Sequence, residues 1–167
     1  MKKIGFTGKC PNGDIIALSD QIRRLQEVGV DSLEVPIYAT DVICGRKINL
    51  PELKILKNTL LDQSIAYTVH GELSVNLMDQ ENFNNHKEVL KRDIEVSSEI
   101  HATHLVTHFG QTTNKIYESK DIYQSYLKKQ QDCYAELGDY AKLNNVTLAI
   151  ENLFPFTFDN YAPLPSE

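Results

Sequence analysis

The sequence has no long hydrophobic run, and none of its apolar stretches approaches the roughly 20 residues that a membrane-spanning helix needs. Its start, Met1 to Phe6, contains a basic pair but lacks the apolar stretch and small-residue cleavage site of a secretory signal. A makeup of 41% apolar and 24% charged residues is typical of a folded globular domain. These features predict a cytoplasmic protein with no membrane partner.

Cysteine and positive charge are also scarce. The three cysteines, Cys10, Cys44 and Cys133, are widely spaced and form no C-x-x-C pair, so we expect free thiols in a reducing compartment. The formal net charge of −6 gives the chain no general attraction for nucleic acid. This balance favours a small-molecule partner over nucleic acid, and it leaves a homo-oligomer open.

Strand-like and helix-like segments alternate along the chain. The helix-like segments carry apolar stripes with a period of 3.6 residues, and the strand-like ones are short apolar runs. In order, the expected elements are a strand over 3–8, a helix capped by Ser19 and stopped by Gly29, a strand over 32–37, a helix from Pro51, a strand over 66–71, a helix over 82–100, a strand over 104–109, a long helix with a stripe from Tyr123 to Ala141, and a strand over 146–152. Strict alternation predicts a parallel sheet with helices packed outside it.

Two folds satisfy this pattern, a doubly wound open sheet and a closed (β/α)8 TIM barrel. No G-x-G-x-x-G turn follows any strand, so the nucleotide-binding version of the open sheet lacks its usual marker. In the last strand, Val146, Leu148 and Ile150 are expected to face helices, while small residues ending in Glu151 face a barrel lumen. We therefore expect a TIM barrel.

A complete TIM barrel needs about 250 residues, and this chain has 167. About five of eight β/α units fit within residues 1–153. Residues 154–167, which are rich in aromatic side chains and proline, have no helix signal and are predicted to be an irregular tail. We therefore expect residues 1–167 to be a partial barrel domain, a fragment of a longer protein.

Three of the expected strands end in a histidine or a glutamate, residue types that often bind metals. His70, His108 and Glu151 each stand at the last or nearly last position of a short apolar run. Because the carboxyl ends of parallel strands lie on one rim, these side chains should converge. Imidazole and carboxylate together suit Zn²⁺, Mn²⁺ or Fe²⁺. The sequence thus predicts a divalent-metal site formed by His70, His108 and Glu151.

Two further carboxylates could reach the same rim. Glu34 lies near the end of the second strand, and Glu72 follows His70 by two residues. Each has a structural alternative, a hydrogen bond for Glu34 and a solvated loop position for Glu72. We predict that both, with His70 and His108, contact the substrate.

Three motifs resemble those of a known superfamily. Val69 to Leu77 (VHGELSVNL), Thr103 to Gly110 (THLVTHFG) and Ala149 to Leu153 (AIENL) resemble the third, fourth and fifth strand ends of xylose isomerase-like TIM barrels. That superfamily holds sugar phosphate isomerases/epimerases and AP endonucleases of the endonuclease IV type (AP endonuclease family 2). The resemblance covers residues 1–153 in order and spacing.

The resemblance implies a role for each matched residue. Glu151 matches the metal-binding carboxylate that, in epimerases, also moves a substrate proton. His70 and His108 match histidines that bind metal in the endonuclease branch or line the substrate pocket in isomerase-like members. The family's ligands on strands six to eight have no counterpart in this sequence.

Three functions follow as alternatives. The favoured one is a metal-dependent sugar (phosphate) isomerase/epimerase, acting on a small ketose or polyol by proton transfer next to a carbonyl through an enediolate. The second is a zinc-dependent AP endonuclease of the endonuclease IV type. The absence of a basic stripe, or of an intercalating loop flanked by Arg or Lys, favours the isomerase. The third is an inactive fragment of either.

Overall fold

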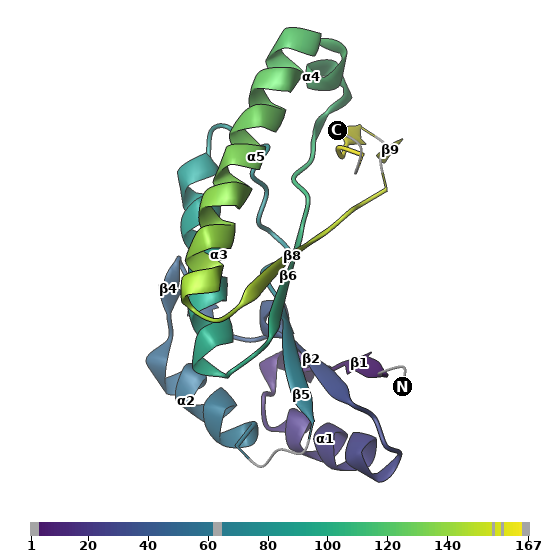
Figure 1. The fold of residues 1–167 in the computed structure, drawn as a ribbon, viewed down its shortest axis with the longest axis vertical. Coiled ribbons are helices and arrows are strands. Elements are labelled where there is room, and N and C mark those ends of the chain that lie inside the picture. The colour runs from purple at the N-terminus through teal and green to yellow at the C-terminus, as the bar shows by residue number, and fades with distance from the viewer. Residues whose placement is uncertain (1–3, 62–64, 155, 158, 165–167) are drawn as a thin grey trace.

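A five-stranded parallel sheet forms the centre of the molecule (Figure 1). The computed structural model describes residues 4–61, 65–154, 156–157 and 159–164. The strand order is β1-β2-β5-β6-β8, and all four pairings are parallel. The strands are β1 (Gly5–Thr7), β2 (Ser32–Pro36), β5 (Ala66–His70), β6 (His104–His108) and β8 (Thr147–Glu151). The predicted parallel sheet is confirmed; Lys3, the expected start of β1, lies outside the described residues.

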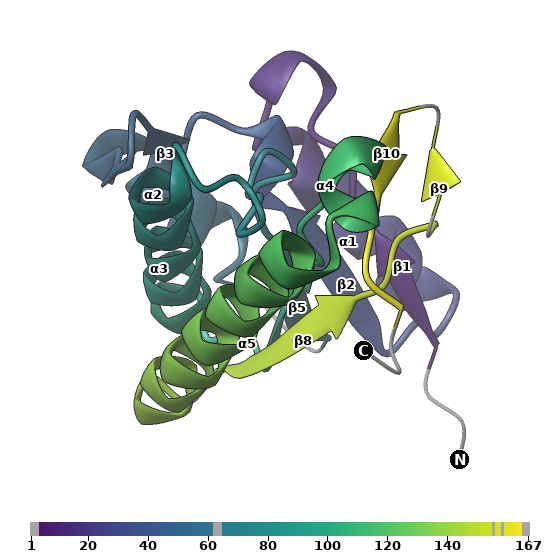
Figure 2. The same ribbon diagram turned by 90° about the horizontal axis from the view of Figure 1, so that it is seen from above.

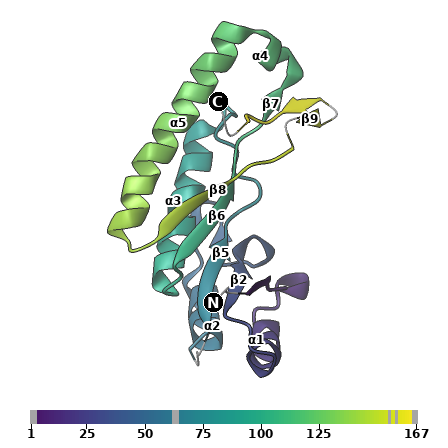
Figure 3. The ribbon, with the colours of Figure 1, turned by 45° about the vertical axis from the view of Figure 1, so that its right-hand side comes forward.

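Helices connect successive strands of this sheet. They are α1 (Ala17–Glu27), α2 (Leu50–Thr59), α3 (Phe83–Glu99), the short α4 (Asn114–Glu118) and α5 (Lys120–Leu143), with one-turn helices η1 (Pro11–Gly13) and η2 (Ile37–Ala39). Figures 1 and 3 show α3 and α5 side by side against one face of the sheet. The predicted stripe of α5 is buried from Tyr123 to Ala141. None of the described helices is long and apolar enough to cross a membrane.

The start of α1 differs from the prediction. We expect Ser19 to cap the helix, but the helix begins at Ala17. The earlier start places Leu18 inside the helix, where it is completely buried. A side-chain hydrogen bond also favours the earlier helix start, because the Ile16 N–H donates to Asp14 Oδ1 at 3.0 Å. Burial of Leu18 therefore outweighs the capping preference of serine. The predicted stop at Gly29 is confirmed by a φ of 75° just after the helix.

The two faces of the sheet have opposite character. On the face that the helices cover, Leu33, Val35, Val69 and Leu105 are fully buried. On the other face, His70, His108 and the residues that alternate with the buried ones are partly buried or exposed. Polar groups on the second face therefore keep part of their hydration.

The last strand departs from its predicted burial. Leu148 packs against the core as expected, but Ile150 keeps 40% of its surface exposed. β8 is an edge strand, and α5, the helix that precedes it, packs against it. Among the described residues after β8 no helix follows to cover Ile150.

Short antiparallel strands lie outside the main sheet. β3 (Ile43–Cys44) and β4 (Lys47–Ile48) form a hairpin, and β7 (Thr112–Thr113), β10 (Asn160–Tyr161) and β9 (Phe156–Thr157) form a small sheet near α4 (Figure 2). The irregular tail predicted for 154–167 is thus wrong for β9 and β10. Tyr161 accounts for the regular structure in this segment, because its side chain is buried and stacks on Tyr117 with ring centroids 3.7 Å apart. Residues 155, 158 and 165–167 lie outside the described residues, and the domain boundary stays a prediction.

Candidate metal centre

Strand register brings three strand ends to one place. In β6 and β8, His108 stands directly opposite Glu151. In β5 and β6, His70 stands opposite Val106, two residues before His108. Because side chains alternate with a period of two, all three project from the same open face of the sheet. The register therefore gathers the predicted trio at the carboxyl end of the sheet.

The donor atoms of these side chains are close together. Glu151 Oε2 lies 3.6 Å from His70 Nε2 and 3.7 Å from His108 Nε2. The two imidazole rings meet edge to face, with centroids 5.0 Å apart. One ligand atom from each of the three residues lies within 4.8 Å of the others. Separations of 3.6 Å and more are too long for hydrogen bonds, so Glu151 is not locked to either imidazole.

This spacing fits a divalent cation. A tetrahedral ion with ligand bonds of about 2.1 Å holds its donor atoms about 3.4 Å apart. The two Glu151 contacts, at 3.6 and 3.7 Å, are within a few tenths of an ångström of that value. Two nitrogens and a carboxylate oxygen are also a common donor set for Zn²⁺ and Mn²⁺. The three residues could therefore hold such an ion if the side chains moved closer together, because their donor atoms lie within 4.8 Å of one another and the ideal separation is about 3.4 Å.

The orientation of His70 is set by its own loop. His70 Nδ1 lies 3.2 Å from the carbonyl oxygen of Gly71. A carbonyl oxygen only accepts, so the proton of the neutral imidazole belongs on Nδ1. Nε2, which lies 3.6 Å from Glu151 Oε2, is then the nitrogen with a lone pair available to a metal. This arrangement, with one ring nitrogen bonded to a backbone carbonyl, is how proteins orient metal-binding histidines.

The surroundings of His108 favour its neutral form. Burial lowers the pKa of the His108 imidazole, and the neighbouring His70 lowers it further. Glu151 acts in the opposite direction and offsets part of the effect. A lowered pKa favours the unprotonated imidazole near pH 7, which is the form that binds metals.

Tyr38 is a neighbour of the site that the sequence analysis missed. It lies in η2, just after β2, and its ring meets His70 edge-on with centroids 5.2 Å apart. His70 is thus held between two aromatic rings, Tyr38 and His108. Only the position of Tyr38 shortly after a strand end hints at this role, and many loop residues share that position.

Glu34 and Glu72 lie outside the ligand cluster. Glu34 Oε1 accepts a hydrogen bond from Thr7 Oγ1 at 3.1 Å, which matches the structural alternative for this residue. Burial raises the pKa of the Glu72 carboxyl. The group of potential ligands formed by the described residues comprises His70, His108 and Glu151 alone. Substrate contact by Glu34 and Glu72 therefore stays a prediction.

A pocket of about 380 Å³ adjoins the trio. His108 lines it together with Leu73, Val75, Asn76, Phe109, Gln111 and Leu153. A larger pocket of about 430 Å³ lies at the opposite end of the sheet, next to the start of β5 and the end of α3. Among the described residues, the cluster of potential metal ligands lies beside the smaller pocket. We take this pocket as the candidate site because of those ligands and not because of its volume.

Comparison with known proteins identifies the family. The family model described as "Xylose isomerase-like TIM barrel" matches residues 22–164, which is most of the chain. The chain belongs to this family. No curated protein matches the sequence.

Solved structures agree with this assignment at the level of the fold. A D-tagatose 3-epimerase-like protein superposes with a TM-score of 0.68 at 17% identity, over 95% of this chain and 55% of its own. A putative xylose isomerase from Rhodospirillum rubrum gives 0.74 at 14%, over 95% and 56%. A xylose isomerase-like TIM barrel protein from Mycobacterium smegmatis, in complex with magnesium, gives 0.59 at 18%, over 86% and 49%. The chain thus spans about half the length of these proteins and has about five of the eight β/α units of a TIM barrel.

Proposed function

We propose that this chain is part of a metal-dependent sugar (phosphate) isomerase/epimerase. The observation that carries the proposal is the convergence of His70, His108 and Glu151, whose ligand atoms lie within 4.8 Å of one another at the carboxyl end of a parallel sheet. Active sites of TIM barrels lie at this end. The neighbouring proteins named as epimerases and isomerases support the same reaction class.

In this proposal, His70 and His108 bind the cation and Glu151 is both ligand and base. A bound divalent ion would polarise the substrate carbonyl and lower the pKa of the adjacent C–H. The Glu151 carboxylate would take that proton, leaving an enediolate, and a proton returned to carbon would complete the isomer or epimer. Half of the Glu151 side chain is exposed, so it can reach a molecule bound in front of the sheet.

The pocket beside His108 suits a small, partly polar molecule. Its walls combine apolar side chains (Leu73, Val75, Phe109) with the polar groups of Asn76 and Gln111. A small ketose, polyol or their phosphates would use the polar groups for orientation. The metal in the proposal is Mn²⁺, Zn²⁺ or a similar ion, and a cytoplasmic location belongs to the same proposal.

A deuterium-exchange assay tests the reaction. The protein, loaded with Mn²⁺, is incubated in D2O with a panel of ketopentoses, ketohexoses and their phosphates, and deuterium at the carbon beside the carbonyl is followed by NMR. We expect incorporation into at least one sugar, and its loss with the Glu151→Gln variant, which keeps the shape but removes the base. The matched control is Glu99→Gln, because Glu99 lies in the pocket at the other end of the sheet.

Two results would overturn the proposal. If calorimetry and elemental analysis detect neither Mn²⁺ nor Zn²⁺ on the folded protein, metal-dependent chemistry at the trio fails. If metal binds but only a duplex with an abasic site is cleaved, the AP endonuclease alternative replaces the isomerase.

A further inference from the structure

The four residues from His108 to Gln111 are held at every position by hydrogen bonds. The His108 carbonyl accepts from the Tyr134 hydroxyl at 2.7 Å, and the Phe109 N–H donates to the Glu151 carbonyl at 3.0 Å. The Gly110 N–H donates to Gln130 Oε1 at 2.8 Å. Gln111 is held through both its backbone N–H and its carbonyl. A loop that leaves a strand end normally has no such fixation, since loops are the more mobile parts of a fold.

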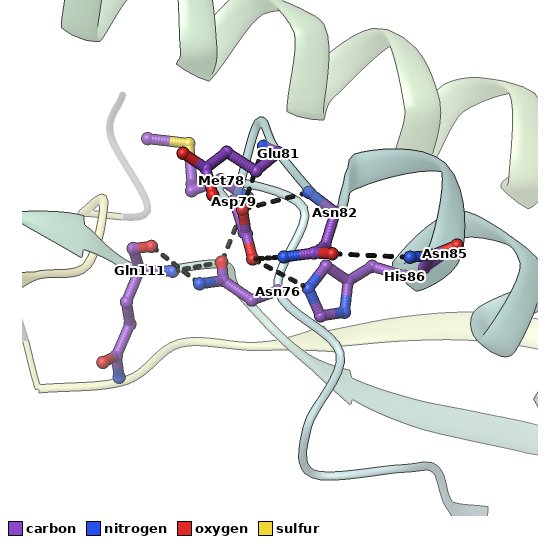
Figure 4. A network of polar contacts seen from close by, with 8 residues as sticks. All are labelled: Asn76, Met78, Asp79, Glu81, Asn82, Asn85, His86 and Gln111. Carbon is purple, nitrogen blue, oxygen red and sulfur yellow. Dashed lines mark hydrogen bonds and ion pairs between the residues drawn. The ribbon is translucent and has the colours of Figure 1, made fainter. Parts of the chain in front are cut away.

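Asn76 provides the bonds to Gln111 (Figure 4). Asn76 Nδ2 donates to the Gln111 carbonyl, and the Gln111 N–H donates to Asn76 Oδ1, both at 2.9 Å. The side-chain amide therefore copies the paired bonds of a β-ladder. The same oxygen also accepts from the Met78 N–H at 3.0 Å. One amide thus links the loop after β5 to the loop after β6.

The contact depends on a close approach at Gly110. A Cβ at this position would lie 2.7 Å from Asn76 Oδ1 and 2.4 Å from Gln130 Oε1. Both distances are shorter than real Cβ contacts, so only glycine lets the two amides reach the backbone here. Gln130 is fully buried, and its amide has nowhere to withdraw without loss of packing.

The rest of the loop after β5 is fixed in a different way. Asp79 accepts from the backbone N–H groups of Glu81 and Asn82 and from the Asn82 side chain, and it lies 3.4 Å from His86 Nε2 (Figure 4). All of these partners belong to the same loop or to the first turn of α3. The Asp79 network is therefore local, whereas the Asn76 amide crosses between two loops.

We propose that Asn76 is a positioning residue for the metal centre. By clamping Gln111, it fixes the direction in which the chain leaves β6 and, with it, the ring position of His108, three residues earlier. Asn76, His108 and Gln111 line the same pocket, so the clamp also shapes the pocket wall next to the trio. The effect on metal binding rests on the proposed function; the effect on His108 itself does not.

Two variants distinguish the hydrogen bond that the Asn76 amide donates from those that it accepts. Asn76→Asp is isosteric and still accepts from Gln111 and Met78, but it turns the donor toward the Gln111 carbonyl into an acceptor. Asn76→Ala removes every bond. Asn82→Ala is the matched control, because it removes an asparagine of the same loop whose side-chain partners, Asp79 and Asn85, are local. Thermal unfolding of each variant establishes that it is folded.

Mn²⁺ titration by calorimetry is the first measurement. We expect Asn76→Asp and Asn76→Ala to lose about 10-fold in affinity, and Asn82→Ala to bind like the parent. This is the low end of what removing a direct partner of a metal ligand costs, because Asn76 acts on His108 through Gln111. The second measurement, without metal, is the Cε1–H NMR signal of His108, which should shift in both Asn76 variants and not in the control. A purely structural role would change the unfolding midpoint and leave both readouts alone.

Each outcome decides the proposal. Unchanged affinity and an unmoved His108 signal in folded Asn76 variants overturn it. If the parent protein binds no Mn²⁺, the proposed function fails, and the His108 signal alone supports or overturns the positioning role. If the Asn76 variants do not fold, amide hydrogen exchange in the parent decides. Protection of the Gln111 N–H comparable to that of Phe109 supports the clamp, and exchange at the rate of an open loop overturns it.

Discussion

The turns and loops at the two ends of the parallel sheet are held by different kinds of hydrogen bond. At the amino end, three helix-to-strand turns repeat one backbone motif. The N–H of Val30, Ala102 and Val146 each donates to a carbonyl five residues earlier, and the residue just before each has positive φ. These are Schellman caps, made by backbone atoms and a buried apolar residue. At the carboxyl end, side chains such as Asn76 and Gln130 hold the loops after β5 and β6.

This difference suggests a division of roles, in which the amino-end turns contribute to stability and the carboxyl-end loops surround the candidate site. A backbone motif that recurs at three helix ends has no need of particular side chains beyond a residue that tolerates positive φ. The side-chain-held loops depend on particular residues, and they surround the one cluster of potential ligands that the described residues form. The larger pocket lies at the amino end, so size alone would have pointed away from the ligand cluster. The predictions below test the contrast, beginning with the largest effect.

Gly110→Ala should damage the side-chain-held end. Its new Cβ would lie 2.4 Å from Gln130 Oε1 and 2.7 Å from the Met78 nitrogen, so we expect a loss of about 3 kcal/mol in the free energy of unfolding. Gly138→Ala is the control, because a Cβ there meets nothing within 4 Å in the middle of α5. It should gain up to about 1 kcal/mol from helix propensity. Urea unfolding measures both, and equal effects would contradict the close packing at Gly110.

The two ends of β6 itself provide a matched pair of histidines. His108→Ala should lower Mn²⁺ affinity by about 100-fold, equivalent to about 2.7 kcal/mol, since it removes a ligand. His104→Ala should leave affinity unchanged, because His104 is exposed at the opposite end of the strand and contacts Thr103. Calorimetry measures both. A similar loss in the two variants would mean that the ion binds elsewhere.

Asp93 lies behind the trio, fully buried on α3, and tests the linkage of stability to pH. Burial raises the pKa of its carboxyl well above the usual value, although the Glu72 N–H that it accepts acts the other way. The folded state therefore binds the proton more tightly than the unfolded state. The stability that this gives is present below pH about 3.9 and is lost as pH rises through the raised pKa.

Asp93→Asn removes that pH dependence. At pH 7 we expect the variant to be more stable than the parent by about 1–3 kcal/mol. On folding, the parent either buries a charge or takes up a proton, and the neutral amide does neither. The difference should shrink as pH falls toward 4. Denaturant unfolding at several pH values checks this. A parent protein that is more stable than the variant at pH 7 would show that the Asp93 carboxylate is well accommodated.

The smallest effect concerns the repeated turns. His101 has a φ of 56° at the position that Gly29 occupies in the first turn, with a φ of 75°. A left-handed conformation costs a residue with a Cβ about 1–2 kcal/mol, so His101→Gly should stabilise the protein by about 1 kcal/mol. Mn²⁺ affinity should not change. Thermal unfolding tests the gain in stability, and calorimetry tests the Mn²⁺ affinity. A change in affinity would contradict the idea that the amino-end turns affect stability alone.

Much of the fold follows from local sequence patterns. The alternation of apolar runs and helical stripes predicts all five strands of the main sheet and the four longer helices, because these signals lie within 5–25 consecutive residues. Glu34 is less well predicted, since its hydrogen bond to Thr7 depends on the pairing of β1 with β2. The stacking of Tyr161 on Tyr117 likewise joins distant parts of the chain, which local patterns do not encode.

For the candidate site, the sequence by itself determined that His70, His108 and Glu151 end neighbouring parallel strands, since strand ends and the period of two are local properties. Only the tertiary structure decided that Glu151 Oε2 lies within 3.7 Å of both imidazoles and that Asn76 clamps Gln111. Those contacts depend on register and on the close approach at Gly110. Both are set by packing between segments that are far apart in the chain, and for that reason no single stretch of sequence contains them.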